Sequence, residues 1–346
     1  MLNLFSPLTL RGLTLRNRIL MPPMCMYCAG TDGIATDWHL SHYHARTRGG
    51  VGLVLVEATA VEPRGRISAY DLGLWDDAQV APLARIADLI HTEGGALGVQ
   101  LAHAGRKAWS RNRGFGPETP AAPSAEAYNE EWATPRALSP DEIDALAEAW
   151  QSAARRAAAA KFDVVEIHGA HGYLAHEFLS PLANHRDDDY GGDLAHRMRF
   201  LLRIVDAVRE VWPANKPLFV RLSASDWVGG GLTLDDTVIV ARALREHGVG
   251  LIHCSGGGMS EAHPPLIGPG YMVPFAERVR QEADIATAAV GLITEADMAD
   301  AIIRNGQADL VALGRELLRH PHWPLDAARA LGYDVEWPLQ YARARL

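Results

Sequence analysis

The chain has 346 residues, 48% hydrophobic and 22% charged, with a formal net charge of −9 at pH 7, which predicts a folded protein and excludes an intrinsically disordered one. The negative balance argues against nucleic acid or an anionic membrane as a partner. Three cysteines are too few for a disulfide scaffold, and we read neither a signal peptide nor a membrane-length apolar run, so we expect a cytoplasmic protein.

Short apolar runs alternate with amphipathic stretches along the whole chain. Most of the runs show no in/out alternation, which is typical of parallel strands buried on both faces. The runs cover residues 19–24, 51–58, 96–101, 164–168, 218–223, 251–255, 285–290 and 310–313.

Three of the intervening helices carry clear start or stop signals. Ser139 can cap free N–H groups, Pro140 suits the first helical position, and Glu142 completes a capping box. Two more helices are indicated, by Leu83, Ile86 and Ile90 before Gly94-Gly95, and by Thr233 with Asp236, Val240 and Leu244.

Repeated strand–helix units predict a parallel sheet, either a closed (β/α)8 TIM barrel or an open doubly wound sheet. We favour the barrel because about eight strands fit one barrel length, no linker divides the chain, and polar residues recur at strand ends. The fold expected is one domain over residues 1–346, with a long excursion after strand three at residues 107–136. Residues from about 320 to 346 form a C-terminal tail.

The exits of the last two strands carry Gly291, Gly314 and Arg315. In this fold the loops at those places commonly bind phosphate, because glycine allows backbone N–H groups close approach and arginine grips the oxygens. The Ser255-Gly-Gly-Gly turn adds a candidate anion nest. The other interpretation is that these glycines only turn the chain.

His168, His171 and Tyr173 follow the end of a buried strand. They can bind a metal, although no third ligand stands near; they can pack in the core; or they can grip a substrate oxygen while Tyr173 donates a proton.

Cys25 and Cys28 form a CxxC, which suggests a thiol redox pair or half a zinc site, but no second CxxC exists. We prefer the interpretation that Cys25 faces the functional site at a strand end and that Cys28 has no role there. Arg221, inside an apolar strand, is either bridged to an acidic neighbour or neutralises a bound anion. Gln100 is its neutral counterpart, an amide that both donates and accepts hydrogen bonds. Neither a Rossmann fingerprint nor a P-loop is present.

Several motifs follow one another at barrel spacing. They are Leu4-Phe5-Ser6-Pro7-Leu8, Asn17-Arg18-Ile19, Pro23-Met24-Cys25-Met26-Tyr27, Val56-Glu57-Ala58-Thr59, Gln100-Leu101-Ala102-His103-Ala104-Gly105-Arg106-Lys107, His168-Gly169-Ala170-His171-Gly172-Tyr173, Asp189-Tyr190-Gly191-Gly192, Val220-Arg221-Leu222-Ser223, Gly291-Leu292-Ile293 and Leu313-Gly314-Arg315. Together they resemble the Old Yellow Enzyme family of flavin-dependent ene-reductases, and most closely its bacterial thermophilic-like class.

The resemblance implies a barrel that holds FMN non-covalently and takes hydride from NADPH or NADH. It implies a ping-pong reduction of α,β-unsaturated carbonyl or nitro compounds, in which hydride passes from the flavin to the β-carbon and Tyr173 protonates the α-carbon. Tyr27, His168 and His171 would contact the substrate, and Cys25 would tune the flavin potential. Together with Ser255 from the glycine-rich turn, the cofactor-binding residues would be Pro22, Pro23, Met24, Cys25, Ala58, Gln100, Arg221, Gly291, Gly314 and Arg315.

In this class an arginine near the C-terminus reaches the neighbouring subunit's site, and Arg343 occupies that place, which implies a homodimer or a homotetramer of dimers. The chain departs from the family pattern at Pro22, where many relatives have Ser or Ala, and at Cys28, where Ser is usual. Its tail also lacks the usual terminal aromatic residue.

Three other functions remain open. A non-redox aldolase or isomerase would use the same phosphate site, but would need a metal or a mid-strand Schiff-base lysine, and Lys107, Lys161 and Lys216 are the only lysines. A longer flavin/iron–sulfur dienoyl reductase would need a cysteine cluster after the barrel. A flavin-binding protein without catalysis would not need the His168, His171 and Tyr173 set.

Overall fold

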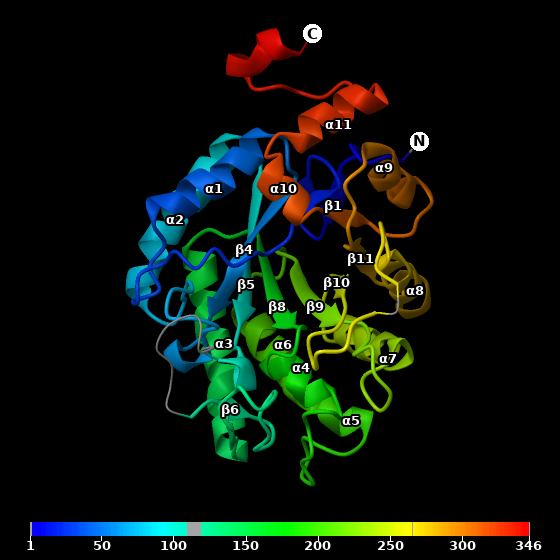
Figure 1. The fold of residues 1–346 in the computed structure, drawn as a ribbon. Coiled ribbons are helices and arrows are strands. Elements are labelled where there is room, and N and C mark those ends of the chain that lie inside the picture. The colour runs from blue at the N-terminus through cyan, green and yellow to red at the C-terminus, as the bar shows by residue number, and fades with distance from the viewer. Residues whose placement is uncertain (1, 109–118, 265, 346) are drawn as a thin grey trace.

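The computed structural model describes residues 2–108, 119–264 and 266–345. Eight parallel strands close into a barrel, which confirms the (β/α)8 prediction (Figure 1). In order around the barrel they are β10 (Leu251–Ser255), β11 (Ala286–Ala289), β12 (Leu310–Ala312), β3 (Ile19–Met21), β4 (Leu53–Ala60), β5 (Ala96–Ala102), β8 (Val164–Gly169) and β9 (Leu218–Ser223). Each predicted run contains or overlaps one of these strands.

Helices surround the barrel. They are α1 (Asp37–Arg48), α2 (Val80–Thr92), α3 (Pro140–Ala159), α4 (Leu174–Leu179), α5 (Leu194–Arg197), α6 (Arg199–Val211), α7 (Leu234–Glu246), α8 (Val273–Ala283), α9 (Ala296–Arg304), α10 (Arg315–Arg319) and α11 (Trp323–Leu331). The predicted capping box before α3 forms, since the Glu142 N–H donates to Ser139 Oγ and the Ser139 N–H to Glu142 Oε2. Thr233 and Asp236 make the same motif before α7. No helix in the described ranges has the length and apolar character needed to cross a membrane.

The barrel interior changes character along its axis. Its amino-terminal half is apolar, and the antiparallel hairpin of β1 (Leu8–Leu10) and β2 (Leu13–Leu15) packs its leucines against that core. Because side chains of a strand face inward at every second residue, the next inward positions lie nearer the carboxyl ends. Those positions are polar: Gln100, Glu166, His168, Arg221 and His253. The carboxyl-terminal end of the barrel interior, called the mouth below, is therefore polar, whereas the amino-terminal end is apolar and is covered by the hairpin.

The excursion after β5 begins at a short 3-10 turn, η3 (Gly105–Lys107), and returns through β6 (Ala121–Ala122) and β7 (Arg136–Ala137), which pair with each other. Its predicted stretch at 109–118 lies outside the described residues. Asn129 donates to Glu261 beyond β10, and the His185 N–H beyond α4 donates to Ser124 Oγ. The excursion thus lies over loops at the carboxyl ends of the strands, as expected. Two further 3-10 turns follow β4: η1 (Pro63–Gly65) and η2 (Asp77–Gln79).

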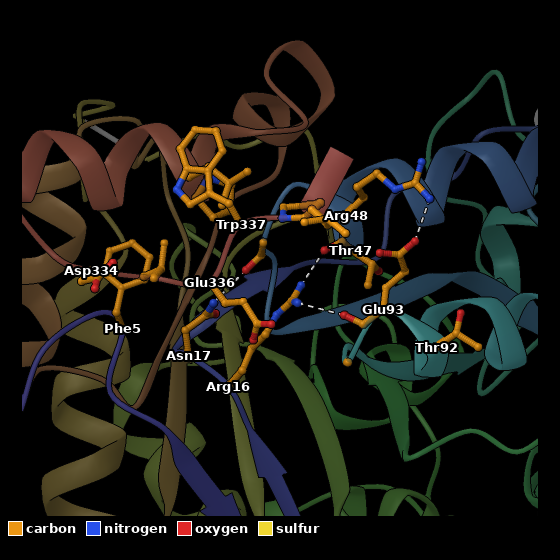
Figure 2. Close-up of a pocket in the computed structure, with 17 residues that line it drawn as sticks. Phe5, Arg16, Asn17, Thr47, Arg48, Thr92, Glu93, Asp334, Glu336 and Trp337 are labelled. Carbon is orange, nitrogen blue, oxygen red and sulfur yellow. Dashed lines mark hydrogen bonds and ion pairs between the residues drawn. The ribbon is translucent and has the colours of Figure 1, made fainter. Parts of the chain in front are cut away.

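The C-terminal tail lies at the other end of the barrel. It ends in the 3-10 turn η4 (Leu339–Ala344) and lines a pocket with residues that precede β3, β4 and β5, namely Asn17, Gly50 and Gly94 (Figure 2). In Figure 1 both termini lie at the end from which β8 and β9 point away. Arg343 is exposed on this turn, far from the mouth of its own barrel.

Candidate active site

His168, His171 and Tyr173 form one aromatic cluster at the mouth. His168 is the second-last residue of β8, and its ring centroid lies 5.1 Å from that of His171 and 5.0 Å from that of Tyr173, with both rings nearly perpendicular to it. His171 lies in a sharp turn rather than on a helix, with a positive φ of 60°. The structure therefore brings together the three residues that the sequence singled out. Among the described residues no group of three or more His, Cys, Asp or Glu is placed to hold a metal ion.

His168 presents one N–H group toward the mouth. The Ala170 N–H donates to Nδ1 of His168 at 3.3 Å, so Nδ1 is a hydrogen-bond acceptor. Burial first, and then the charge of Arg221, lower the pKa of His168 well below 6.5. A neutral imidazole with an accepting Nδ1 carries its hydrogen on Nε2. His168 is therefore a neutral donor, suited to an oxygen on which negative charge develops.

His171 is fixed by two serines. Its backbone N–H donates to Ser223 Oγ at 2.9 Å, and its Nε2 lies 2.7 Å from Ser255 Oγ. Because a serine hydroxyl can donate, Nδ1 of His171 can carry the hydrogen and face a substrate. Burial and the Arg221 charge also lower the pKa of His171 well below 6.5, so it is neutral as well.

The glycines beside His171 allow two loops to touch. Gly172 has a φ of 71°, and a Cβ there would lie 2.1 Å from the carbonyl oxygen of Gly258. Gly258 in turn lies against the backbone of His171. Gly258, the last glycine of the Ser255-Gly-Gly-Gly run, is therefore needed for close packing of the backbone. Whether Ser255 also binds an anion stays a prediction.

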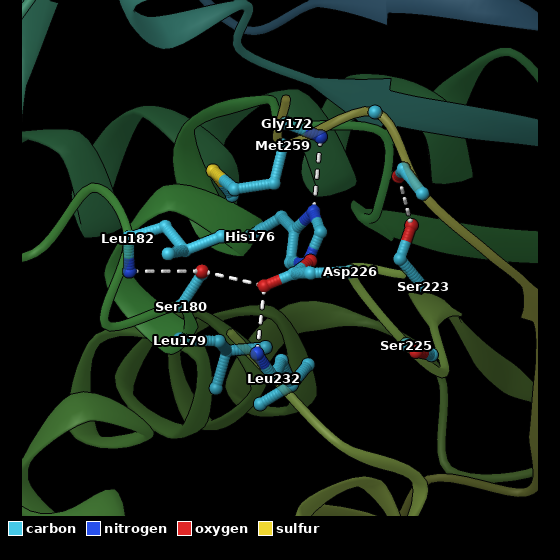
Figure 3. A network of polar contacts seen from close by, with 12 residues as sticks. Gly172, His176, Leu179, Ser180, Leu182, Ser223, Ser225, Asp226, Leu232 and Met259 are labelled. Atoms are coloured by element: carbon cyan, nitrogen blue, oxygen red, sulfur yellow. Dashed lines mark hydrogen bonds and ion pairs between the residues drawn. The ribbon is translucent and has the colours of Figure 1, made fainter. Parts of the chain in front are cut away.

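A buried polar network holds the loop from below (Figure 3). The Gly172 N–H donates to Nδ1 of His176 at 2.9 Å, and Nε2 of His176 lies 3.0 Å from Oδ1 of Asp226. The other Asp226 oxygen accepts from Ser180 Oγ and from the Leu232 N–H. This network joins α4 to the loop after β9, and so positions the turn between His171 and Tyr173.

Cys25, Tyr27 and Tyr173 pack against one small apolar cluster that contains Ala58. Neither Cys25 nor Cys28 forms a disulfide. Sγ of Cys28 lies 3.5 Å from Nε2 of His39. Burial, and then the Glu57 carboxylate, raise the pKa of Cys28 to about 11, which disfavours the thiolate form that a redox pair would need.

Arg221 is buried at the mouth without a carboxylate partner. It is 8% exposed, its Nε makes no hydrogen bond, and no ion pair joins it to any described residue. Burial lowers its pKa, which the charge of Glu166 partly offsets. Glu166 is thus an acidic neighbour that acts on Arg221 through its charge without forming an ion pair with it, and a bound anion at Arg221 stays a prediction.

Both carboxylate oxygens of Glu166 have partners on other strands, which the sequence analysis did not predict. Its Oε1 accepts from Nε2 of Gln100 at 2.8 Å, and its Oε2 lies 2.9 Å from Nδ1 of His253. All three side chains are buried on separate strands. Because the side-chain N–H of Gln100 donates to Glu166, the side-chain oxygen of Gln100 is available to another partner. The only sequence signal for this cluster was a polar residue inside each of three apolar strands.

Lys107 is a second residue whose place the sequence did not predict. Nζ donates to the carbonyl oxygens of His171 and Gly258, and lies 5.3 Å from the ring centroid of Tyr173. Burial lowers its pKa to about 8. Lys107 therefore ties together the two loops that meet at His171.

The predicted phosphate residues lie at the exits of β11 and β12. A Cβ on Gly314 would lie 3.7 Å from Pro22 and 3.6 Å from Met24, so this exit adjoins that of β3. Arg315 is exposed, and its side chain makes no hydrogen bond or ion pair with any described residue. Only Gly314 directly precedes a helix, α10, because α9 begins at Ala296, well after Gly291. A helix N-terminus thus follows one of these two exits directly and not the other.

Comparisons with known proteins cover nearly the whole chain. Residues 3–332 match the model of the NADH:flavin oxidoreductase / NADH oxidase family. The chain is 52% identical over 344 residues to an NADPH dehydrogenase of Geobacillus thermodenitrificans and 48% identical over 341 residues to one of Bacillus subtilis, with 98% of each chain covered. Among solved structures, morphinone reductase is 30% identical with a TM-score of 0.80, covering 97% of this chain and 91% of that one. An old yellow enzyme homologue from Zymomonas mobilis is 27% identical with a TM-score of 0.79, covering 97% and 95%.

Proposed function

The chain belongs to the NADH:flavin oxidoreductase / NADH oxidase family and is an oxidoreductase, and from that premise we propose that it is an FMN-dependent ene-reductase. Its substrates would be α,β-unsaturated carbonyl or nitro compounds, and NADPH or NADH its hydride donor. Curated relatives named NADPH dehydrogenase support the nicotinamide part of this proposal.

The residues at the mouth fit FMN. A buried guanidinium with an unpartnered Nε suits the anionic part of a flavin ring, and the exposed Arg315 beside Gly314 suits a phosphate. FMN, when bound, would supply hydride transfer from the nicotinamide to the alkene. The residues that would hold it without a covalent bond are Pro22, Pro23, Met24, Cys25, Ala58, Gln100, Arg221, Ser255, Gly291, Gly314 and Arg315.

The protein's own side chains would then divide the work on the substrate. His168 and His171, both neutral donors, would bind the carbonyl or nitro oxygen on which negative charge builds. Tyr27, which packs against the same small apolar cluster as Tyr173, would also contact the substrate. Tyr173, against the same ring cluster, would donate its phenol proton to the α-carbon.

Arg221 is the observation that carries the proposal. A buried cation without an ion pair is costly, and an anion bound at that point would compensate it. A phosphorylated substrate of an aldolase would satisfy Arg315 equally well, but that reaction needs a metal or a lysine within a strand. Lys107, Lys161 and Lys216 all lie outside the barrel strands.

Stopped-flow spectroscopy tests the proposal in two steps. Purified protein should be yellow, and the chromophore released by acid should show flavin fluorescence. Mixing with NADPH or NADH should bleach the flavin band, and cyclohexenone should restore it. A colourless protein that takes up no FMN on soaking would refute the proposal.

We also infer that the working enzyme is a homodimer or a homotetramer of dimers in the cytoplasm. Arg343 lies at the end of the barrel opposite the mouth, so it can serve a substrate only in another subunit's site. Replacing Arg343 with Ala should raise the KM for cyclohexenone, and size-exclusion chromatography should give an oligomer. A fully active monomer would contradict this inference.

A further inference from the structure

A β-bulge in β4 turns one carboxylate away from the mouth. Val56 pairs with Val99 and Ala58 with Gln100, so Glu57 is an extra residue opposite β5. An extra residue reverses the facing of all that follow it in the strand. Ala58 therefore joins the cluster with Cys25, Tyr27 and Tyr173, while Glu57 contacts α1.

Glu57 is 1% exposed, yet it is surrounded by hydrogen-bond donors. Its Oε2 accepts from the backbone N–H of Met26 at 2.6 Å. Its Oε1 accepts from the Tyr43 hydroxyl at 3.1 Å and lies 3.2 Å from Nε2 of His39. Charged acceptors make strong hydrogen bonds, so this carboxylate is a firm anchor for the Met26 backbone.

The anchored residue stands between the two residues of this loop that face the site. Met26 separates Cys25 from Tyr27, and Tyr27 has a φ of 53°, in the left-handed region that a side chain other than glycine rarely adopts. Such a conformation persists only where its surroundings hold it. The bond from the Met26 N–H to Glu57 acts on the residue immediately before it.

We propose that Glu57 is a positioning residue of the active site, which holds Tyr27 and Cys25 in place through the backbone N–H of Met26. Glu57 touches neither substrate nor cofactor. The inference rests on the proposed function, because it assigns a task to a residue behind the substrate contact Tyr27 and the flavin neighbour Cys25.

Replacement of Glu57 by Gln tests the role in the FMN-loaded enzyme. An amide offers only one acceptor oxygen, so either the Met26 bond or the Tyr43 and His39 contacts must be lost. We expect 4-hydroxybenzaldehyde, a phenol probe for the substrate site, to bind about tenfold more weakly. We expect KM for cyclohexenone to rise more than kcat falls, and the flavin reduction potential to move toward that of Cys25→Ala.

Double-mutant cycles separate positioning from general damage. In a Tyr27→Ala background, Glu57→Gln should not weaken phenol binding further, and in a Cys25→Ala background it should not move the potential further. Additive effects in both backgrounds would overturn the proposal.

Asp300→Asn is the matched control. Asp300 is also a buried carboxylate that accepts from a backbone N–H, that of Leu4, and from a tyrosine hydroxyl, that of Tyr333. The Asp300→Asn variant should have a lower melting temperature than wild type, with unchanged phenol affinity and flavin potential. Equal shifts in Asp300→Asn and Glu57→Gln would reduce Glu57 to a structural residue.

Failure of the proposed function and failure of the Glu57 inference give different results. If wild-type protein fails to bind FMN or to reduce cyclohexenone, the proposed function fails; if it does both while Glu57→Gln behaves as wild type, only this inference fails. If Glu57→Gln does not fold, Glu57→Asp keeps the charge but shortens the reach. It should then show the same shifts, and wild-type behaviour of that variant would overturn the proposal.

Discussion

Burial at the mouth keeps the His168 imidazole neutral and leaves its Nε2–H as a donor. We expect His168→Ala to slow reduction of cyclohexenone and to weaken phenol binding, each by about 100-fold, because one donor to the developing oxyanion is lost. Half-reaction kinetics and phenol titration of the flavin spectrum measure both effects. His91→Ala, which removes a half-exposed imidazole paired with Asp163, is the control and should behave as wild type. Full activity in His168→Ala would exclude the oxyanion role.

Tyr173 is proposed to donate a proton to the alkene and to take no part in hydride transfer. Loss of its hydroxyl should therefore slow only the half-reaction that reduces the alkene. Tyr173→Phe keeps the ring packed against His168 and removes the hydroxyl. We expect alkene reduction to slow by 10²-fold or more, which is typical for loss of a general acid, while bleaching by NADPH keeps its rate. Stopped-flow traces of the two half-reactions decide this. An unchanged alkene half-reaction would give the acid role to water or another donor.

Arg221 is a case in which function and stability oppose each other. Replacing it with Met removes a buried charge that has no ion-pair partner among the described residues, so the apo protein should melt at a higher temperature. FMN should bind at least tenfold more weakly, since its anionic groups lose the cation. Calorimetry of the apo protein and fluorescence titration with FMN measure the two effects. Arg85→Met, which breaks an exposed ion pair with Asp37, should move neither quantity. A less stable apo protein with wild-type FMN affinity would contradict the assignment.

The turn between β8 and α4 couples an element of the barrel to its neighbour. Gly172 and Gly192 both have positive φ, 71° and 82°, but only Gly172 meets an obstacle, the Gly258 carbonyl. We expect Gly192→Ala to cost about 1–2 kcal/mol of stability, from backbone conformation alone. Gly172→Ala should cost clearly more and should also weaken phenol binding, because the loop must move with His171. Thermal unfolding and phenol titration compare the two variants. Equal behaviour of both would show that the loop contact does not matter.

Glu177 and Lys107 give the whole molecule a characteristic dependence of stability on pH. Burial raises the pKa of Glu177 from 4.5 to about 8, so the folded state binds the extra proton between those values and stability falls as pH rises through them. Burial lowers the pKa of Lys107 from 10.5 to about 8, so stability rises with pH between about 8 and 10.5. Together these two groups favour a minimum of folding stability near pH 8.

Glu177→Gln isolates the acid limb of this dependence. The amide oxygen can still accept from the Arg106 N–H, as Oε1 does at 2.8 Å, and the variant carries no charge at any pH. Its melting temperature relative to wild type should therefore increase from pH 4.5 to pH 8. Asp71, whose pKa burial raises to about 6, adds the same slope to both proteins and cancels in the difference. Glu148→Gln, on the exposed face of α3, should show no such trend. A constant difference for Glu177→Gln would mean that the carboxyl is ionised throughout this range.

Local patterns in the sequence determined the elements of this protein. The capping box at Ser139 depends on atoms three residues apart, and buried parallel strands need apolar side chains on both faces, so both can be recognised without a partner in view. His168, His171 and Tyr173 lie within six residues at the end of one predicted strand, and for that reason they could be placed together in advance. The prediction of FMN came from the resemblance of the motifs to the Old Yellow Enzyme family.

Only the tertiary structure decided which partners the buried charges have. The sequence left Arg221 with two alternatives, and it could not show that the oxygens of Glu166 bond Gln100 and His253 on two other strands. It also gave no sign that a bulge turns Glu57 toward α1 and Met26. Hydrogen bonds and ion pairs between residues far apart in the chain depend on register, bulges and loop paths to within an ångström or so, and no local pattern of residues encodes those positions.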